Sequence, residues 1–376
     1  MDRLHKTLDG LLVISIEQAV AAPICTMRLA DAGARVIKVE QQGGETARHY
    51  DNVVGGHSAY FASLNRGKES ICLDLKTDDD QALLRRMLEK ADVFVRNTGP
   101  GAMARMGLDG ESLKALYPAL ITVDIVGYGQ DTPYKEMKAY DLLVQAESGL
   151  CSVTGTKETP CKVGVSIADM GTGMNAYAAI LEALIERART GAGKALEIAM
   201  FDSMAEWMSV PLLQLECAGK TTARFGLAHA SIYPYRPYPC EDGDVLIAVQ
   251  NNAQWRKLCH TVLLLPELED DQRFTSNARR VQNRDALDTI IVNVTGGLSV
   301  AKLVERLEKA GIAYARLSTL EDLTSHTALR RQTVVSGDTQ SFLSVASPIP
   351  RFWDTPPKLP EIGEHTQSVR DQFNSV

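Results

Sequence analysis

The chain has 376 residues, which is enough for two domains of ordinary size, each with its own hydrophobic core. Hydrophobic residues make up 45% and charged residues 23% of the sequence, as is typical of a soluble globular protein. The formal net charge of −7, without any block of Lys and Arg, argues against a nucleic-acid partner.

Cysteine usage and the N-terminal sequence predict a cytoplasmic protein. The seven cysteines are scattered, odd in number and never spaced as Cys-x-x-Cys, so we expect reduced thiols and neither a disulfide framework nor a metal site. The N-terminus lacks the apolar core of a signal peptide, and no apolar run reaches the thickness of a bilayer. We therefore expect no membrane partner.

The first third of the chain alternates between apolar strands and helices. We expect strands at residues 11–16, 34–40, 70–75, 91–95 and 121–125, and helices at 25–32, 78–90 and 113–117. This alternation predicts an α/β fold with a parallel sheet that is covered on both faces. Ligands of such sheets bind beyond the carboxyl ends of the strands.

The second half of the chain changes in character. A helix at 142–147, a strand at 195–200 and a helix at 203–217 precede a stretch rich in Tyr and Pro at 219–239, which predicts a linker or a wrapped arm. A smaller α+β unit is expected to begin at residue 241. It would contain strands at 245–249 and 312–317 and helices at 253–264, 284–294 and 300–310, followed by an extended, proline-rich tail at 344–360.

A single carboxylate follows an apolar stretch in the middle of the chain. Residues 163–168 are rich in β-branched side chains and predict a buried strand, whereas the apolar spacing over 174–184 predicts a helix. Asp169 would lie at this junction, where Gly171 and Gly173 leave room for a group that approaches its carboxylate. By itself, this position favours a helix N-cap over a chemical role, because Asp is a preferred N-cap residue and the helix dipole stabilises its charge.

Several further motifs have ordinary explanations. Residues 171–176 match a loose dinucleotide-binding pattern, but Asp169 would point a negative charge at the pyrophosphate. Residues 99–101 form either a tight turn or, with nearby basic side chains, a phosphate site. On residue type alone, surface or packing roles are favoured over catalysis for His229 and Tyr140.

Several short segments carry a resemblance to a known family through their order and spacing. They are residues 8–11 through Ala22-Pro23, residues 29–40, Asn65-Arg66-Gly67-Lys68, and residues 73–76, 91–93, 97–101, 127–130, 163–174 and 363–366. Together they resemble the class III CoA-transferase family, which also contains the α-methylacyl-CoA racemases. The resemblance extends over nearly the whole chain.

The resemblance implies that Asp169 is a nucleophile. In that family the matching carboxylate attacks the thioester carbonyl of an acyl-CoA and gives a mixed anhydride and free CoA thiolate. CoA then passes to an incoming acid through an aspartyl-CoA thioester. Backbone N–H groups near Gly171 would hold the developing oxyanion, and Tyr140 matches a position near the reacting acyl group.

The resemblance also implies substrates and a binding site. The partners would be an acyl-CoA and a small carboxylic acid, and no permanently bound cofactor is implied. The positions that match the CoA site of the family are Gln18, Ala19, Lys38, Arg66, Lys68, Asn97, Gly99, Arg105 and Lys138.

The implied architecture is a Rossmann-like large domain with a smaller α+β domain in an interlocked homodimer. The large CoA-binding domain would span residues 1–205 and be completed by 330–376. Residues 206–240 would form a linker, 241–320 the small domain, and 321–376 the return segment and the end of the large domain.

Departures from the family pattern narrow the range of reactions that we expect for this chain. Formyl-CoA transferases carry a run of glycines that is missing between Phe225 and Gly243, and racemases have a catalytic His where this chain has Tyr140. Residues 201–208 and 224–232 look most like the branch that acts on mesaconate, itaconate, citramalate or succinate. We hypothesise that Arg224 and His229 pair with the distal carboxylate of such a dicarboxylate. The alternatives are an acyl-CoA racemase and a catalytically silent CoA-binding protein.

Overall fold

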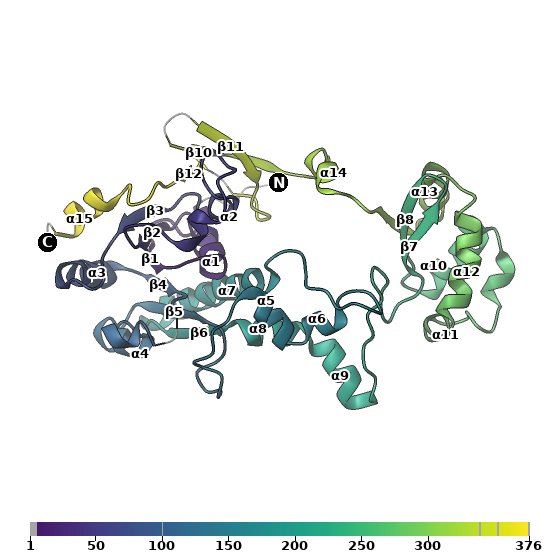
Figure 1. The fold of residues 1–376 in the computed structure, drawn as a ribbon, viewed down its shortest axis with the longest axis horizontal. Coiled ribbons are helices and arrows are strands. Elements are labelled where there is room, and N and C mark those ends of the chain that lie inside the picture. The colour runs from purple at the N-terminus through teal and green to yellow at the C-terminus, as the bar shows by residue number, and fades with distance from the viewer. Residues whose placement is uncertain (1–5, 100, 338–339, 352, 375–376) are drawn as a thin grey trace. The chain divides into compact units, whose positions relative to one another are not determined.

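The computed structural model describes residues 6–99, 101–337, 340–351 and 353–374 (Figure 1). The chain divides into two compact units. The first comprises the described residues of 1–150, 163–210 and 330–376, and the second comprises residues 151–162 and 211–329. Both units are therefore assembled from segments that are distant in the sequence.

A six-stranded sheet forms the centre of the first unit. Its strands are β1 (Leu12–Ile16), β2 (Arg35–Glu40), β3 (Glu69–Cys72), β4 (Val93–Arg96), β5 (Ile121–Val126) and β6 (Ala195–Ala199). They follow the order β3-β2-β1-β4-β5-β6, and all neighbours are parallel. The predicted α/β fold with a parallel sheet is confirmed. The strand order reverses between β1 and β4, and ligands of doubly wound sheets bind beside such a reversal.

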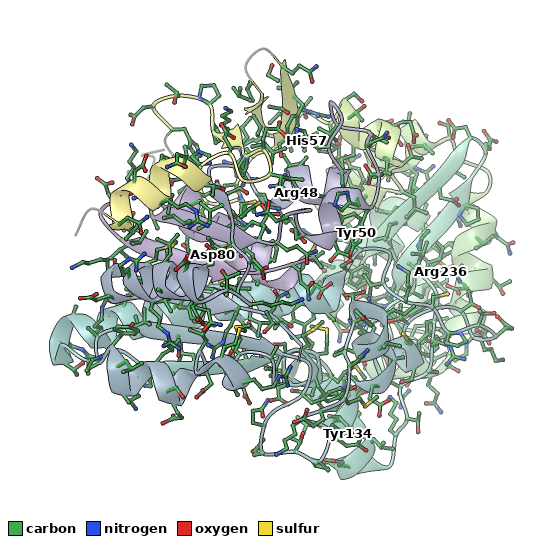
Figure 2. All side chains as sticks on the ribbon, turned by 60° about the vertical axis from the view of Figure 1, so that its left-hand side comes forward. Arg48, Tyr50, His57, Asp80, Tyr134 and Arg236 are labelled. Atoms are coloured by element: carbon green, nitrogen blue, oxygen red, sulfur yellow. The ribbon has the colours of Figure 1, made fainter. Side chains whose placement is uncertain are left out.

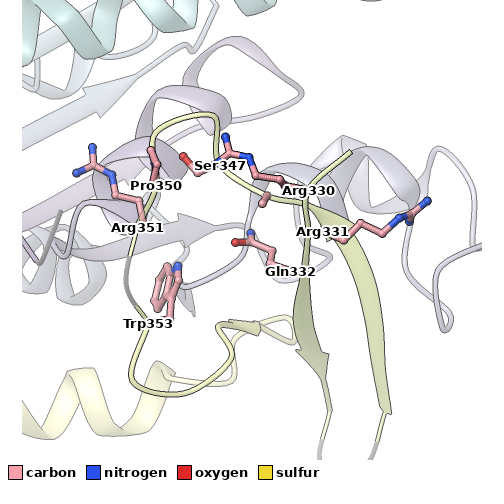
Figure 3. Close-up of a pocket in the computed structure, with 8 residues that line it drawn as sticks. Arg330, Arg331, Gln332, Ser347, Pro350, Arg351 and Trp353 are labelled. Atoms are coloured by element: carbon pink, nitrogen blue, oxygen red, sulfur yellow. The ribbon is translucent and has the colours of Figure 1, made fainter. Parts of the chain in front are cut away.

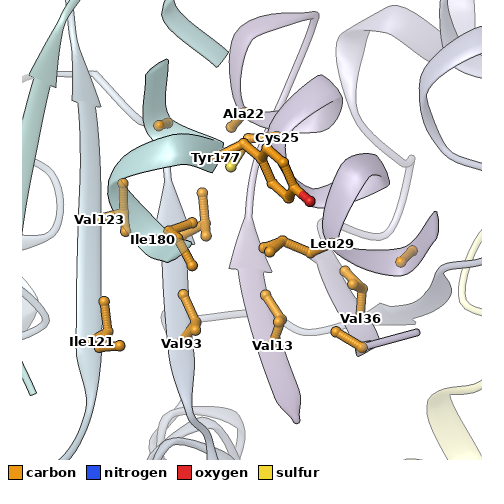
Figure 4. Close-up of a cluster of buried hydrophobic side chains, with 14 of the residues drawn as sticks. Val13, Ala22, Cys25, Leu29, Val36, Val93, Ile121, Val123, Tyr177 and Ile180 are labelled. Atoms are coloured by element: carbon orange, nitrogen blue, oxygen red, sulfur yellow. The ribbon is translucent and has the colours of Figure 1, made fainter. Parts of the chain in front are cut away.

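Helices cover both faces of this sheet. The helices of the first unit are α1 (Ala21–Asp31), α2 (Ala59–Leu64), α3 (Asp78–Lys90), α4 (Gly110–Leu116), α5 (Asp141–Glu147), α7 (Ile167–Thr190), α8 (Met200–Trp207) and α15 (Thr366–Asn374), with short turns η1 (Thr46–His49) and η2 (Ala104–Met106). Because strand side chains alternate, Val13 and Val93 pack on one face against Leu29 of α1 and Ile180 of α7 (Figure 4). The opposite face packs against α3 and α15.

The C-terminal segment adds a second, small sheet to the first unit. In it β11 (Gln340–Val345) pairs antiparallel with β10 (Arg331–Ser336), and β12 (Lys358–Leu359) pairs parallel with β10. Val334 and Leu359 pack against Phe61 and Ala62 of α2. These contacts attach the C-terminal residues to the first unit.

The second unit has its own core. Its antiparallel sheet follows the order β7 (Tyr235–Cys240), β8 (Gly243–Ala248), β9 (Ala313–Arg316). Its helices are α10 (Asn252–Lys257), η3 (Leu258–Leu263), η4 (Pro266–Glu269), α11 (Asn277–Gln282), α12 (Arg284–Thr295), α13 (Val300–Ala310) and α14 (Leu320–Thr324). Buried Trp255, Leu287 and Leu303 belong to one cluster under the sheet. The chain passes between the units within α6 (Leu150–Val153), within α9 (Ser209–Ala218) and in the segments at 162–163 and 329–330.

The strand predicted at residues 163–168 does not form. Helix α7 begins at Ile167, before the predicted start near Gly173, and residues 163–166 pair with no strand. Val165 is 53% exposed. β-branched residues favour a strand only where a neighbouring strand and a buried face accept them, and this segment has neither. Asp169 therefore lies inside the first turn of a helix.

Two further differences from the predicted elements involve proline residues. The helix predicted at 203–217 is divided into α8 and α9, because Pro211 has no N–H to donate to the carbonyl of Trp207, where α8 ends. The predicted linker at 219–239 contains most of β7, whose Pro237 and Pro239 are tolerated since β7 is an edge strand. Strands β10 and β11 and helix α15 were not predicted.

Among the described residues, no single helix has both the length and the apolar composition needed to cross a membrane. Helices α12 and α13, which are bent by 113° to each other, meet that requirement only as a pair.

Helices α1 and α7 approach each other closely at Gly173. A methyl group on Gly173 would lie 2.2 Å from the carbonyl oxygen of Ala21 and 2.2 Å from Ile24 Cγ2. Alanine stabilises an ordinary helix by about 1 kcal/mol relative to glycine. We nevertheless expect Gly173→Ala to lower the free energy of unfolding by about 2 kcal/mol, because the helices must separate. Urea unfolding measures the difference, with Glu182→Ala on the exposed face of α7 as the control. A Gly173→Ala variant at least as stable as the wild type would contradict this packing.

Candidate active site

Asp169 is the third residue of α7, and it does not cap the helix. The N-cap is Ser166, whose side chain makes no capping hydrogen bond. The carboxylate of Asp141, the first residue of α5, takes this role, because its Oδ1 accepts from the amides of Ala168 at 2.8 Å and Asp169 at 3.3 Å. The interpretation of Asp169 as a helix N-cap is therefore wrong.

Asp141 is itself held in place. Its Oδ2 accepts a hydrogen bond of 2.7 Å from Gln145 Nε2, and Gln145 Oε1 accepts from the amide of Val163 at 2.9 Å. Residues one helical turn apart on α5 thus anchor both the start of α7 and the chain that leads to it.

The carboxyl group of Asp169 titrates near neutrality. Burial raises its pKa from 3.8 to about 7, and the negative charge of Asp141 raises it further in the same direction. A carboxylate with a raised pKa is more basic than an ordinary one, and perturbed pKa values of this kind are frequent among catalytic groups.

Tyrosines lie in the neighbourhood of Asp169. Tyr140 directly precedes Asp141 and is 67% exposed. The pKa of Tyr50 is raised by burial and then by the charges of Glu45 and Asp169, which places these carboxylates within electrostatic reach of the Tyr50 hydroxyl. Figure 2 shows Tyr50 just after Arg48, on the segment that precedes α2. Tyr50 was not among the predicted site residues.

The two glycines after Asp169 face protein atoms. A Cβ on Gly171 would lie 2.9 Å from Trp207 Cη2 and 3.0 Å from Met204 Cε, and that of Gly173 would meet α1. The prediction that both glycines leave open space is wrong. The amide of Met170 donates to the Ser166 carbonyl at 2.9 Å, and Gly171 lies inside the helix, where amides pair with the carbonyl four residues earlier. An oxyanion bound at Gly171 would therefore compete with a helical hydrogen bond.

The predicted loop residues Gln18 and Ala19 meet Asn97 at the strand reversal. The amide of Gln18 donates to Asn97 Oδ1, and Asn97 Nδ2 donates to the carbonyl of Gln18, both at 2.9 Å. Ala19 has φ +60°, a left-handed conformation that costs a non-glycine residue free energy. Its amide donates to Glu45 Oε2 at 2.8 Å, and this bond holds the strained residue in place.

A buried ionic network lies behind this loop. Lys38 Nζ contacts Glu45 Oε1 at 2.8 Å and Glu17 Oε1 at 3.4 Å, while Lys68 Nζ contacts Glu17 Oε1 at 2.7 Å. Both lysines also donate to Asn65 Oδ1. All four charged side chains are buried. Two cations and two anions balance within the network, which is the condition for burying charges at tolerable cost.

The two lysines differ in the direction of their pKa shift because they lie near different numbers of carboxylates. Burial lowers the pKa of Lys68 to about 8 despite Glu17. Burial also acts on Lys38, but Glu17 and Glu45 together outweigh it and raise the pKa. In Glu17, burial would raise the pKa, and Lys68 and Lys38 reverse that effect and lower it. The shifted pKa values of Glu17, Lys38 and Lys68 are therefore set by burial and by one another's charges.

The other predicted cations divide into paired and exposed groups. Arg66 is buried and forms a two-point pair with Asp31, at 3.0 and 2.5 Å. Arg105 and Lys138 are exposed, as is Gly99, and neither cation forms an ion pair within the described residues. Arg105 and Lys138 are thus available to a phosphate, whereas Lys38, Arg66 and Lys68 already have carboxylate partners.

Arg224 and His229 lie in the second unit. Arg224 donates through three nitrogens to the carbonyls of Thr156, Ser152 and Lys157, at 2.8 to 3.1 Å, which holds the 151–162 segment in that unit. His229 stacks on Tyr235 with a centroid distance of 5.4 Å. Its Nδ1 accepts from the amides of Ser231 and Ile232, both at 3.0 Å, so its proton lies on Nε2.

Within the described residues, no group of three or more His, Cys, Asp or Glu side chains has an arrangement that could hold a metal ion.

Comparisons with known proteins identify the family. The profile of CoA-transferase family III matches residues 8–366. Succinyl-CoA:glutarate CoA-transferase of Mus musculus is 34% identical, over 97% of this chain and 86% of its own length. Succinyl-CoA:mesaconate CoA-transferase of Haloarcula hispanica is 35% identical, over 80% of this chain and 78% of its own. The crystal structure of a CaiB/BaiF family protein from Brucella suis is 35% identical, with a TM-score of 0.81 over 97% of this chain and 99% of that one.

The chain therefore belongs to CoA-transferase family III and is an enzyme of that family. The resemblance inferred from the sequence is confirmed.

The raised pKa of Asp169 has a consequence for stability. Between about pH 4 and pH 7 the folded state binds more protons at this residue than the unfolded state, so its contribution to stability falls as the pH rises. We expect the neutral, isosteric Asp169→Asn to be more stable than the wild type at about pH 8, by at most about 4 kcal/mol. The difference should shrink as the pH falls toward 4.

Chemical denaturation at several pH values measures this difference, and Asp202→Asn, an exposed first-turn aspartate of α8, is the control. Equal stability of Asp169→Asn and the wild type at about pH 8 would contradict the burial of an ionised carboxylate.

Proposed function

We propose that this enzyme moves CoA from an acyl-CoA thioester to a small dicarboxylic acid through covalent intermediates on Asp169. The observation that carries the proposal is the carboxylate of Asp169 in the first turn of α7, with a pKa raised to about 7 and its capping role taken by Asp141. A structural cap would be fully ionised and engaged with amides, whereas this carboxylate accepts no hydrogen bond within the described residues.

The proposed sequence has four steps. An oxygen of Asp169 attacks the thioester carbonyl, the C–S bond breaks, and an anhydride and CoA thiolate result. The thiolate attacks the Asp169 carbonyl and releases the donor acid, which leaves an aspartyl-CoA thioester. The acceptor carboxylate attacks this thioester and forms a second anhydride, and the released thiolate attacks the acceptor carbonyl. Asp169 is then a carboxylate again, and each step is a simple acyl substitution.

We propose three roles for the predicted CoA-binding residues. Arg105 and Lys138, which are exposed, bind the phosphates of CoA. The part of CoA that connects its phosphates to the thioester lies along Gln18, Ala19, Asn97 and Gly99. The buried Lys38, Lys68 and Arg66 support that loop from behind. Tyr140 contacts the acyl group beside Asp169.

The acceptor is proposed to be a C4–C5 dicarboxylate. Relatives named for glutarate and mesaconate support the class. Arg224 uses three of its five N–H groups on carbonyls, and the remaining two, with the Nε2–H of His229, are proposed to bind the distal carboxylate.

A homodimer in the cytoplasm is part of the proposal. The apolar side chains of α9, including Val210 and Leu213, are exposed in the single chain, and such a surface is typical of an interface. All seven cysteines are free thiols, which suits a reducing compartment.

The covalent mechanism predicts an adduct on one residue. After incubation with succinyl-CoA and quenching with hydroxylamine or borohydride, we expect intact-protein mass spectrometry to show a modification that maps to Asp169. Asp169→Asn should lack it, and the control Asp202→Asn should keep it. Equal modification of Asp169→Asn and the wild type would contradict the assignment. Deuterium exchange at the substrate α-carbon without any adduct would favour a racemase.

The substrate assignment predicts selective losses. Arg224→Met removes the charge proposed to bind the distal carboxylate, so kcat/KM for succinate should fall at least about tenfold more than for a monocarboxylate of similar length. Arg316→Met, which removes an exposed charge from the same unit, should leave both values unchanged. Equal losses for both acceptors would mean that Arg224 serves only to clamp the 151–162 segment.

A further inference from the structure

A pocket of the first unit has no part in the proposed transfer reaction. It encloses about 400 Å³ between β10 and the chain that follows β11, and its polar lining residues are Arg330, Arg331, Gln332, Ser347, Arg351 and Trp353. Figure 3 shows Gln332 extending from β10 toward Trp353, with the guanidinium of Arg331 turned away from the other side chains.

The pocket walls contain unused hydrogen-bond donors. Gln332 Nε2, Arg351 Nε and Trp353 Nε1 are all buried, and none has a hydrogen-bond partner within the described residues. Buried N–H groups in native proteins are nearly always paired, so unpaired ones need an explanation. All three are donors, and the missing partner is therefore an acceptor.

The surrounding charge is positive. Arg330, Arg331 and Arg351 line the pocket, and Arg28 of α1 donates to Ser347 Oγ at 3.0 Å. None of these four arginines pairs with a carboxylate within the described residues, and no lining residue is acidic. Burial lowers the pKa of Arg28, and the charges of Arg66 and Arg351 act in the same direction despite Asp31. Arginines crowded together without a directly paired carboxylate are typical of an anion site.

We propose that this pocket binds a small oxyanion, in which phosphate or carboxylate oxygens accept from Gln332, Arg351 and Trp353. Arg330 and Arg28 supply further positive charge. Since Arg351 also donates to the Tyr177 hydroxyl on α7 at 3.2 Å, a bound anion joins the C-terminal segment to α1 and α7. These helices carry the Gln18 loop and Asp169. The site goes beyond the proposed function and does not depend on it.

Chemical protection of arginine tests the proposal on the full chain. Phenylglyoxal modifies accessible guanidinium groups, and peptide mapping reports the rate at each arginine. With inorganic phosphate added at constant ionic strength, against chloride, we expect modification of Arg330 and Arg351 to slow severalfold, while exposed Arg189 on α7 is unaffected. A parallel arm with succinate separates the two sources, because protection by only one of them identifies phosphate or carboxylate as the preferred oxyanion.

Two variants keep the test specific. Trp353→Phe keeps an aromatic ring over Gly67 but removes the indole N–H, and Arg351→Gln removes one charge. Phosphate should raise the thermal unfolding midpoint of the wild type and of Arg189→Gln, and should raise it less for both pocket variants. Equal protection of Arg189, or an equal rise in all variants, would overturn the proposal. Slow phenylglyoxal modification of Arg330 and Arg351 without any added anion would also overturn the proposal, since a second copy of the chain would then cover the donors.

Discussion

The hydrogen bonds from the first amides of α7 to the Asp141 carboxylate determine whether the Asp169 carboxylate caps its own helix. A helix N-terminus favours a carboxylate, and Asp169 would ordinarily satisfy the local amides itself. Asp141 accepts from the amides of Ala168 and Asp169 instead, which leaves the side chain of Asp169 free at the same end of the helix. The same Asp141 carboxylate adds a negative charge nearby, and together with burial it raises the pKa of Asp169 to about 7. Asp141 thus positions the start of α7 and frees the Asp169 carboxylate from capping, while burial, aided by the charge of Asp141, makes that carboxylate more basic.

The loop opposite this helix depends on buried charge in a similar way. Ala19 is held at φ +60° by the carboxylate of Glu45, and Glu45 is fixed by Lys38 within a network that Glu17 and Lys68 complete. Removing one member of such a network leaves a buried charge without a partner, which costs more free energy than an exposed ion pair contributes. The close approach of α1 and α7 at Gly173 connects the loop to the helix of Asp169. Several buried contacts therefore converge on the site.

The sequence predicted the parallel sheet and its helices well because apolar periodicity reports local burial, as in the strand at 121–125 and the helix at 78–90. It failed at 163–168, since β-branched composition does not show whether a strand finds a neighbour. Asp141, Glu45 and Tyr50 were missed because their roles depend on contacts between distant segments. A signal did exist for Asp141, which begins a helical apolar pattern directly after Tyr140. The burial of Lys38 and Lys68 was not predictable from residue type, because the same residues would suit a phosphate site.

In the proposed mechanism, the carboxylate of Asp169 exchanges an oxygen with its substrates. In the proposed steps, the anhydride formed with the acceptor leaves one acceptor oxygen on Asp169 when the thiolate attacks the acceptor carbonyl. Incubation with succinyl-CoA and succinate labelled with ¹⁸O in its carboxylates, followed by mass spectrometry of the peptide that contains Asp169, tests this directly. We expect ¹⁸O in Asp169 after turnover and none in Asp141 or Asp202. Turnover without any label in Asp169 would mean that CoA passes directly between the two acids and would contradict the covalent mechanism.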